Sequence, residues 1–289
     1  MAKEQTDAAY AVRMDRVVQY IWEHLDAQLD LETLADVACF SPYHFHRLYR
    51  MITGETTAQT VRRLRLHRAA AQLGEGGKTI EQIAKRAGYG SVEAFTRAFS
   101  SAYGQPPAAY RAEREAAARQ FAPETVTSQF KVTVEEHPAL TLVGFPHRGD
   151  YQEIGRAFER LYAWAFPAGI VMPEARHIGV YDTDETAVPK AELKSFAGVS
   201  VDGVPSLPDG AETVSVPASL VAKLQFKGPY AELEEPYRYL YGVWLPQSGY
   251  EPRDFPCFED YLNNPREVPP PELLTDIYLP LLPKGSEVP

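Results

Sequence analysis

The stretch FHRLYRMITG, Phe45 to Gly54, recurs fifty residues later as FTRAFSSAYG, Phe95 to Gly104. The two copies share a phenylalanine, an arginine, a second aromatic residue and a final glycine at matching offsets. Each copy also follows a short helical stretch, in which Ala35 and Ala84 lie about ten residues before the phenylalanine. A duplicated helix-turn-helix with an arginine on each second helix is expected to contact DNA twice.

Capping residues predict where each second helix begins. Ser41-Pro42 supplies an N-cap followed by a proline in the first turn, and Ser91 caps the equivalent helix of the second copy. A long helical stretch over residues 57–73 joins the copies and should be roughly 25 Å long. It could hold the two second helices one DNA turn apart, ~34 Å. Further helices are predicted over residues 12–27, 31–38 and 80–87 and from Pro106-Pro107 onward.

Charge is distributed unevenly along the chain. Residues 1–120 carry 16 Lys and Arg against 14 Asp and Glu, a net charge of +2, whereas residues 121–289 carry 13 against 25, a net charge of −12. The acidic half should repel DNA, which leaves DNA contact to the first half. No apolar run approaches the ~20 residues of a membrane span. We therefore expect a multidomain chain, divided at 1–120 and 121–289, in the cytoplasm at the nucleoid, with no membrane partner.

Several fixed positions of the first half match one family signature. The motif IAxxxGYxSxxxFxRxF spans Ile83 to Phe99, and GxxP at Gly104 to Pro107 is followed by Tyr110-Arg111. Over about residues 10–115 the chain resembles the AraC/XylS family. The resemblance implies an all-α domain with two helix-turn-helix motifs, in which the outward side chains of both second helices read base edges. These side chains are Tyr43, His46, Arg47 and Arg50 in the first copy and Val92, Glu93, Thr96 and Arg97 in the second.

The chemistry of these residues suits DNA to different degrees. Arg47 and Arg97 can each make a bidentate contact with guanine or clamp a phosphate, whereas Glu93 would accept from cytosine or repel the backbone. For the four arginines of the connecting helix, a phosphate contact and a solvated helix face remain equally open. These are Arg62, Arg63, Arg65 and Arg68. His44 and His46 point to different faces of their helix, so we expect no metal there.

The second half is also internally duplicated, at a spacing of 79 to 80 residues. GDYQEI at Gly149–Ile154 returns as GPYAEL at Gly228–Leu233, and Trp164 matches Trp244. Each unit has the pattern of a strand, a helix and two strands. Two such βαββ units are expected to pair about a pseudo-twofold axis and leave a crease, and concave aromatic creases are common ligand sites. The strands are predicted at 132–134, 140–145, 177–181, 197–201, 220–226, 257–261 and 276–279.

The second half contains the motifs GxYxE(I/L), FExY and TDIYLPL, which match a second family. Over roughly residues 128–282 it resembles the α+β GyrI-like effector-binding domain, and the two domains together resemble the Rob-type subgroup. In that family a buried glutamate in an aromatic cavity meets cationic or polar ligands; Glu259 matches it best, with Asp276 second. An entering cation would stabilise such a carboxylate, and aromatic faces would add cation–π attraction. The implied effector residues are Glu259, Tyr151, Trp164, Tyr230, Trp244 and Asp276.

Together these patterns favour a ligand-responsive transcription factor. It would bind double-stranded operator DNA and a small amphipathic, cationic or aromatic effector, which would change DNA affinity or RNA polymerase contact through the region of Pro123. Two alternatives remain: a GyrI-like hydrolase that uses Glu259 as a base with Tyr151 or Tyr230, and an acidic module that binds gyrase or another basic partner. The sequence has no nucleophile elbow, metal cluster or Gly-rich phosphate loop, so we expect no catalytic residues, no metal and no cofactor.

Overall fold

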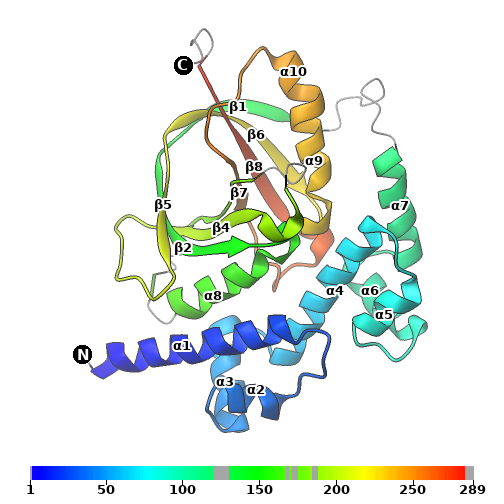
Figure 1. The fold of residues 1–289 in the computed structure, drawn as a ribbon, viewed down its shortest axis with the longest axis vertical. Helices are drawn as coiled ribbons and strands as arrows, with labels where there is room; N and C mark the ends of the chain where they lie inside the picture. Colours follow the sequence, from blue (N-terminus) through cyan, green and yellow to red (C-terminus); the bar gives the residue numbers. More distant parts are fainter. Residues whose placement is uncertain (1, 120–129, 167–168, 171–174, 184–187, 284–289) are drawn as a thin grey trace.

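The helical part of the computed structural model has the order of short and long helices that the sequence predicts (Figure 1). The structure describes residues 2–119, 130–166, 169–170, 175–183 and 188–283. The predicted domain boundary at residue 120 and the region of Pro123 lie outside these ranges. The helices are α1 (Ala2–Glu23), α2 (Leu31–Val37), α3 (Pro42–Thr53), α4 (Thr57–Glu75), α5 (Ile80–Arg86), α6 (Val92–Tyr103) and α7 (Pro107–Arg119).

Local capping signals fix the ends of the two recognition helices, α3 and α6. The side chain of Ser41 accepts a hydrogen bond from a backbone N–H of the first turn of α3, and Ser91 does the same for α6. Such a cap stabilises a helix by about 1 kcal/mol. Gly54 and Gly104 end the two helices with φ of +78° and +76°, a left-handed conformation that suits glycine. The duplication therefore extends to the local chemistry of both helix ends.

Helix α4 is shared by two separate hydrophobic cores. Its first half contributes Val61 and Leu64 to a core built with α1, α2 and α3. Its second half contributes Leu66 and Leu73 to a core built with α5, α6 and α7. Because both helix-turn-helix motifs pack on the same helix of 19 residues, α4 sets the positions of α3 and α6 relative to each other.

The tight turn inside each helix-turn-helix places one residue in the left-handed region. This residue is Gly88 in the second copy, with φ of +82°, and Cys39 in the first, with φ of +53°. A β-carbon on Gly88 would lie 2.3 Å from Nη1 of Arg65, whose guanidinium donates to the carbonyls of Leu25 and Ala27. The second turn therefore requires glycine for its conformation and for the space that Arg65 occupies.

Gly88→Ala is expected to destabilise the protein by about 2 kcal/mol, because it adds left-handed strain and a steric contact with Arg65. The matched change Cys39→Gly relieves the same strain in the first copy and should raise stability by up to about 1 kcal/mol. Urea unfolding midpoints of both variants measure these effects. A midpoint of Gly88→Ala equal to that of the wild type would contradict this explanation of the turn.

The second half forms one curled antiparallel sheet (Figure 1). Its strands are β1 (Val132–His137), β2 (Leu140–Arg148), β3 (His177–Tyr181), β4 (Lys194–Ser200), β5 (Glu212–Val216), β6 (Ser219–Lys227), β7 (Cys257–Tyr261) and β8 (Leu274–Leu281). Its helical segments are η1 (Tyr151–Glu153), α8 (Gly155–Ala165), η2 (Lys190–Glu192), η3 (Tyr230–Glu232), α9 (Glu234–Tyr239), η4 (Leu240–Trp244), α10 (Leu245–Ser248) and η5 (Pro270–Glu272). Strand β5 is absent from the sequence prediction.

The two predicted units exchange their edge strands. The strand order is β1-β6-β8-β7-β3-β4-β2-β5, and β3 and β7 join the units at the centre. Strand β1 precedes β2 in the chain but pairs with β6, and β5 precedes β6 but pairs with β2. The expectation of two sheets that meet at a crease is corrected to one continuous sheet of eight strands.

Alternation along the strands divides the sheet into a helix-covered face and an inner face. Val143 of β2 packs in a core with α8, while its neighbour Leu142 packs with Phe258 inside the curl of the sheet. Helix α9 lies over the second unit, where the core of that unit joins Leu240 to Ile277 of β8. The helix-covered face is therefore the one that also faces the helical domain.

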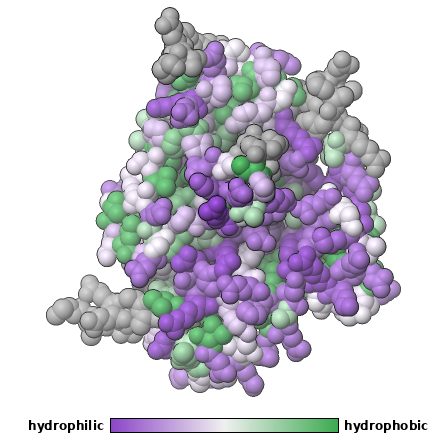
Figure 2. Space-filling model, in the orientation of Figure 1, coloured by the Kyte–Doolittle hydropathy of each residue, from purple (hydrophilic) through white to green (hydrophobic). Residues whose placement is uncertain are grey.

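The helical domain and the sheet domain pack directly on each other along α1 and α8. Ala163 of α8 belongs to the core of the first helix-turn-helix. Arg160 of α8 pairs with Asp15 of α1 at 2.7 Å, and Arg156 pairs with Glu23 at 2.9 Å. Figure 2 shows mostly hydrophilic surface over the helical domain on the face drawn. Polar contacts therefore accompany the apolar packing between the two domains.

Candidate DNA interface and effector cavity

Helix α3 presents a polar face away from its core. Tyr43 is 65% exposed, Arg47 and Arg50 are exposed, and His46 is half-buried. Nη1 of Arg47 donates to the hydroxyl of Tyr43 at 2.8 Å, one helical turn earlier. This hydrogen bond keeps the guanidinium on the outer face of the helix, where its remaining N–H groups can reach a guanine edge or a phosphate.

The corresponding face of α6 is polar in a different way. Glu93 and Arg97 are exposed, and Val92 and Thr96 are half-buried. Hydrogen bonds with its own backbone N–H and with the Ser91 side chain lower the pKa of Glu93, so this carboxylate is ionised at neutral pH. An ionised carboxylate at a helix start can accept from cytosine and disfavours phosphate. All eight side chains predicted to contact DNA lie on α3 or α6, and none of them is fully buried.

Three of the four arginines on α4 make contacts inside the protein. Arg63 donates to two carboxylates, Arg65 to two backbone carbonyls and Arg68 to the carboxylate of Asp26. The sequence left open whether these three arginines contact phosphate or lie on a solvated face. In the structure they do neither, because their guanidinium groups are bonded within the protein. Arg62 is exposed. The connecting helix is therefore mainly a structural support for the two recognition helices.

A cavity of about 1680 Å³ lies between the sheet domain and the helical domain. The helical domain lines it with Trp22 and His67 among other residues, and the sheet domain lines it around Glu259. Glu259 is only 2% exposed, and its Oε2 accepts hydrogen bonds from the hydroxyls of Tyr261 at 2.7 Å and Tyr181 at 3.2 Å. The two tyrosine hydroxyls also contact each other.

Aromatic rings surround this carboxylate. The ring of Tyr230 lies 5.2 Å from that of Tyr261, and the ring of Tyr151 lies 4.8 Å from that of Tyr181. Burial, and then the charge of Glu259, raises the pKa of both Tyr181 and Tyr261 well above the ordinary value. Their hydroxyls therefore stay protonated and can donate. A carboxylate enclosed by electron-rich rings is an arrangement that attracts organic cations.

Gly179 provides the space for this arrangement. It lies on β3 directly opposite Glu259 of β7. A β-carbon on Gly179 would lie 3.0 Å from the hydroxyl oxygens of both Tyr181 and Tyr261. Any side chain at this position would therefore push on the two hydroxyls that hold the carboxylate. No local pattern in the sequence indicates this role, because it depends on the pairing of β3 with β7.

Comparison with known families agrees with this geometry. Residues 130–282, more than half of the chain, match the model of the GyrI-like small molecule binding domain. The chain belongs to the GyrI-like family. Residues 34–113 match a helix-turn-helix domain. The predicted combination of an AraC-type helix-turn-helix domain with a GyrI-like domain is therefore confirmed.

Two curated proteins are similar in sequence to part of this GyrI-like chain. It is 33% identical to the transcriptional regulator Rob of Salmonella typhimurium over 138 residues, 48% of this chain and 47% of that protein. It is 32% identical to the right origin-binding protein of Escherichia coli K12 over 138 residues, with the same two coverages of 48% and 47%. The chain thus spans about half the length of the curated relatives it matches.

A solved structure also resembles this GyrI-like chain. The cryo-EM structure of the EcmrR–DNA complex in EcmrR-RPo is 17% identical and covers 86% of this chain and 84% of that chain, with a TM-score of 0.48. Separately, no helix in the described part of the chain combines the length and apolar character of a membrane span.

The GyrI-like cavity contains half of the effector residues predicted from sequence. It is lined by Glu259, Tyr151 and Tyr230. The two tryptophans are not among its lining residues. Trp164 packs edge-on against Phe145, and Trp244 stacks on Tyr250. Both tryptophans therefore serve the packing of the GyrI-like domain, contrary to the expectation from sequence.

Asp276 faces the opposite side of the sheet from Glu259. The register of β7 and β8 pairs Glu259 with Ile277 and Asp260 with Asp276, and side chains alternate between the two faces of a sheet. Asp276 is 3% exposed and pairs with Lys223 at 2.8 Å. The structure therefore places Asp276 outside the cavity around Glu259, contrary to the expectation from sequence.

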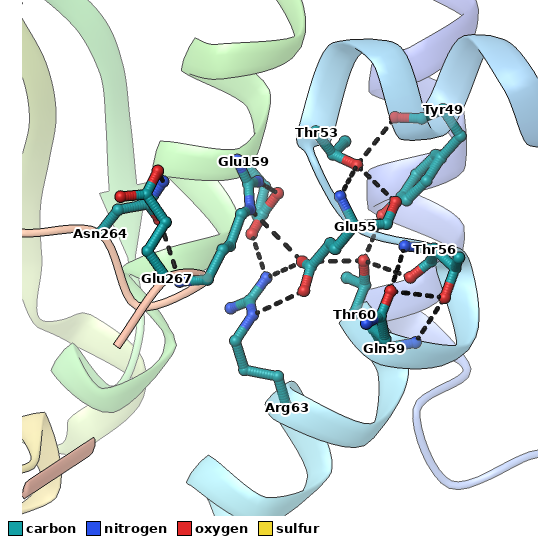
Figure 3. Close-up of polar contacts among 11 residues, drawn as sticks. Tyr49, Thr53, Glu55, Thr56, Gln59, Thr60, Arg63, Glu159, Asn264 and Glu267 are labelled. Atoms are coloured by element: carbon teal, nitrogen blue, oxygen red, sulfur yellow. Dashed lines mark hydrogen bonds and ion pairs between the residues drawn. The ribbon is translucent and has the colours of Figure 1, made fainter. Parts of the chain in front are cut away.

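The wall of the cavity contains a buried charge cluster that the sequence did not reveal (Figure 3). It consists of Glu55, Arg63 and Glu159, which Figure 3 labels, together with Arg266. A nitrogen of Arg63 lies 2.5 Å from Glu55 and 2.9 Å from Glu159, while Arg266 pairs with Glu159 and lies 3.3 Å from Glu55. The four residues come from distant parts of the chain, so no local motif could identify them.

Proposed function

We propose that this chain is a DNA-binding transcriptional regulator whose GyrI-like cavity binds a small amphipathic effector, cationic or aromatic. The observation that carries the proposal is the carboxylate of Glu259, buried among tyrosines in a chain that also exposes two equivalent recognition helices. As a regulator it would act on operator DNA in the cytoplasm, at the nucleoid, with RNA polymerase as a further partner.

The cavity favours an organic cation with aromatic character over other effectors. A small inorganic cation would lose its hydration shell in a site of this size without gaining a full set of oxygen ligands. A lipophilic cation has little hydration to lose, and it gains both the charge of Glu259 and the faces of Tyr181, Tyr230 and Tyr261. Each aromatic face contributes roughly 0.5–2 kcal/mol to such binding.

The recognition helices support DNA binding by a single chain. The two helix-turn-helix motifs pack on α4, so one molecule presents both Arg47 and Arg97 without a partner subunit. The sheet domain carries most of the negative charge and should be repelled by the phosphate backbone. This combination favours binding with α3 and α6 toward the duplex and the GyrI-like domain away from it.

Arg47→Ala and Arg97→Ala are each expected to weaken binding to DNA by about tenfold, within the ~1–3 kcal/mol typical of an arginine contact. The duplex should be one that the wild type selects from a random pool, and affinity is measured by fluorescence anisotropy at several salt concentrations. A base contact relaxes sequence preference at one position, whereas a phosphate contact lowers the salt slope by about one.

The control for both arginine variants is Arg148→Ala, which removes an exposed arginine from β2. It should bind the selected duplex as the wild type does. If Arg47→Ala and Arg97→Ala also bind like the wild type, α3 and α6 are not the DNA-reading helices, and the proposed function fails.

The hydrolase alternative has less support from the geometry. It required Glu259 to act with Tyr151 or Tyr230, but the hydroxyl of Tyr151 donates to the backbone carbonyls of Thr183 and Lys194. The hydroxyls that donate to Glu259 belong to Tyr181 and Tyr261. We therefore propose a binding role for the cavity without turnover of the effector.

A further inference from the structure

The buried charge cluster of Glu55, Arg63, Glu159 and Arg266 connects the two domains. Glu55 lies between α3 and α4, and Arg63 lies on α4, so both belong to the first helix-turn-helix. Glu159 lies on α8, and Arg266 lies in the segment between β7 and η5, so both belong to the GyrI-like domain. All four side chains are largely buried, with exposures from 8% to 21%. Each domain contributes one positive and one negative charge, and two ion pairs cross between the domains, Arg63 with Glu159 and Arg266 with Glu55.

Electrostatics make the cluster sensitive to the loss of any member. Burial alone would raise the pKa of Glu159, but the guanidinium groups of Arg266 and Arg63 outweigh it and hold that pKa below its ordinary value. The carboxylate of Glu159 is therefore ionised at neutral pH. Removing one partner from such a group leaves an uncompensated buried charge, which strongly disfavours the arrangement, whereas removing a balanced pair does not.

A chain of hydrogen bonds continues from the cluster into recognition helix α3 (Figure 3). The hydroxyl of Thr60 donates to Oε1 of Glu55 at 2.9 Å, and the same oxygen of Thr60 lies 2.8 Å from the hydroxyl of Tyr49. Tyr49 is only 1% exposed and lies on the buried face of α3, opposite the face that carries Arg47. These two hydrogen bonds therefore connect Glu55 to the helix that presents Arg47.

The second helix-turn-helix provides an internal comparison. At the offset of fifty residues, Gln105 replaces Glu55 and Glu113 replaces Arg63. These two side chains form one exposed hydrogen bond, from Nε2 of Gln105 to Glu113 at 2.7 Å. The motif therefore folds without a buried charge cluster at this position. Both copies contact the GyrI-like domain, since Arg114 of α7 pairs with Glu232 and Glu235. The buried pair at the positions of Glu55 and Arg63, however, is present in the first copy and replaced in the second.

The cluster also belongs to the effector cavity. Its four residues all line the cavity, as do Tyr162 and Tyr261 beside them. The guanidinium of Arg266 lies over the ring of Tyr162 at 5.4 Å, and Arg266 follows Tyr261 by five residues on the segment that leaves β7. A molecule held by Glu259 and Tyr261 would thus be bound next to the segment that carries Arg266.

From these contacts we propose that the charge cluster couples the effector cavity to recognition helix α3, so that an occupied cavity changes DNA binding through the first helix-turn-helix. This inference rests on the proposed function for the identity of the two ligands. It assigns Glu159 and Arg266 as positioning residues, which act on DNA binding through Glu55 and Arg63. The route from cavity to α3 passes across the domain interface, so it does not require the segment around Pro123.

The test uses the full chain and the double variant Glu159→Gln with Arg266→Gln. This variant removes one charge of each sign and leaves the pair of Glu55 and Arg63 balanced. The matched control is Asp15→Asn with Arg160→Gln, which removes another ion pair between α8 and the helical domain, at 2.7 Å, that lies outside the cluster. The single variant Glu159→Gln supplies a second perturbation of the same link.

Two measurements are made on each protein. The first is amide hydrogen exchange of α3 and α6 in the free chain, which needs neither DNA nor effector. The second is the ratio of DNA affinities with and without the lipophilic cation tetraphenylphosphonium, with its own affinity measured by calorimetry. Couplings between sites typically change affinity by about 5- to 150-fold. We expect the double variant to reduce the wild-type ratio to near one at a cation concentration that saturates the variant.

Exchange of α3 should be at least about fivefold faster in Glu159→Gln, with α6 unchanged and the control like the wild type. A double variant that keeps the wild-type ratio, or an α3 that exchanges at the wild-type rate in Glu159→Gln, would overturn the inference. If tetraphenylphosphonium leaves wild-type DNA affinity unchanged, the exchange result alone decides. Faster exchange confined to α3 then supports the link and places the failure in the proposed effector, whereas unchanged exchange rejects the link.

Discussion

Glu259→Gln is expected to weaken the binding of tetraphenylphosphonium by about 100-fold. The change keeps the volume of the side chain and an oxygen that can accept from Tyr181 and Tyr261, so it removes mainly the negative charge. Interaction between a cation and a buried carboxylate is much stronger than in water because the site is shielded from solvent. A loss of about 3 kcal/mol corresponds to that factor. Isothermal titration calorimetry on the full chain measures it.

The control for this prediction is Glu272→Gln. Glu272 contributes the same charge to the GyrI-like domain, but its side chain is 55% exposed and pairs with Lys227. We expect this variant to bind the cation as the wild type does. If both variants weaken binding equally, the cation responds to the overall charge of the domain. If neither does, Glu259 is not the group that holds it, and the assignment of the cavity as a cation site is wrong.

Gly144→Ala is expected to destabilise the protein by about 4 kcal/mol, the largest effect on stability that the structure predicts for a single methyl group. Gly144 of β2 lies opposite Gly198 of β4, and a β-carbon on it would lie 1.9 Å from the carbonyl oxygen of Ala197. The obstacle is backbone in a paired strand, so no side chain can rotate away to relieve it. Unfolding midpoints in urea, read from the signals of both domains, measure the loss.

Gly203→Ala is the matched control for Gly144→Ala. Gly203 is exposed in the connection between β4 and β5, and a β-carbon there would meet nothing within 4 Å. Its midpoint should stay within about 0.5 kcal/mol of the wild type. A mild effect of Gly144→Ala, similar to that of the control, would show that β2 and β4 can separate at this point and that the close pairing is not required.

The sequence was most informative where the signal is local. Ser41 and Ser91 before their helices, and Gly54 and Gly104 after them, are recognised from capping chemistry that acts within one turn. The repeat extends these signals over two copies, and the structure has both recognition helices within two residues of the predicted starts. Outward positions such as Arg47 follow from helical periodicity alone, and the structure leaves it exposed.

The sequence was least informative where a residue's role depends on pairing between distant strands. Whether Asp276 shares a face with Glu259 depends on the register of β7 against β8, and a shift of one residue would reverse the answer. Gly179 is important only because β3 lies beside β7. Glu159 resembles any carboxylate on an amphipathic helix until Arg63 and Arg266 are brought to it from 96 and 107 residues away.

The exchange of β1 and β5 has a consequence for how such a domain can arise and be divided. A single repeat expressed alone would expose unpaired backbone N–H and C=O groups at one edge of its sheet. Its exchanged strand, β1 or β5, would also lack the strand with which it pairs in the whole domain. Two copies of that repeat could pair these edges by exchanging strands with each other, as the protomers of a strand-swapped homodimer do. Because the two repeats are joined in one polypeptide, they pair within the chain. Two separate chains would pair only at a concentration high enough for them to dimerise. We expect neither repeat to be monomeric when expressed without its neighbour, which analytical ultracentrifugation of each fragment can check.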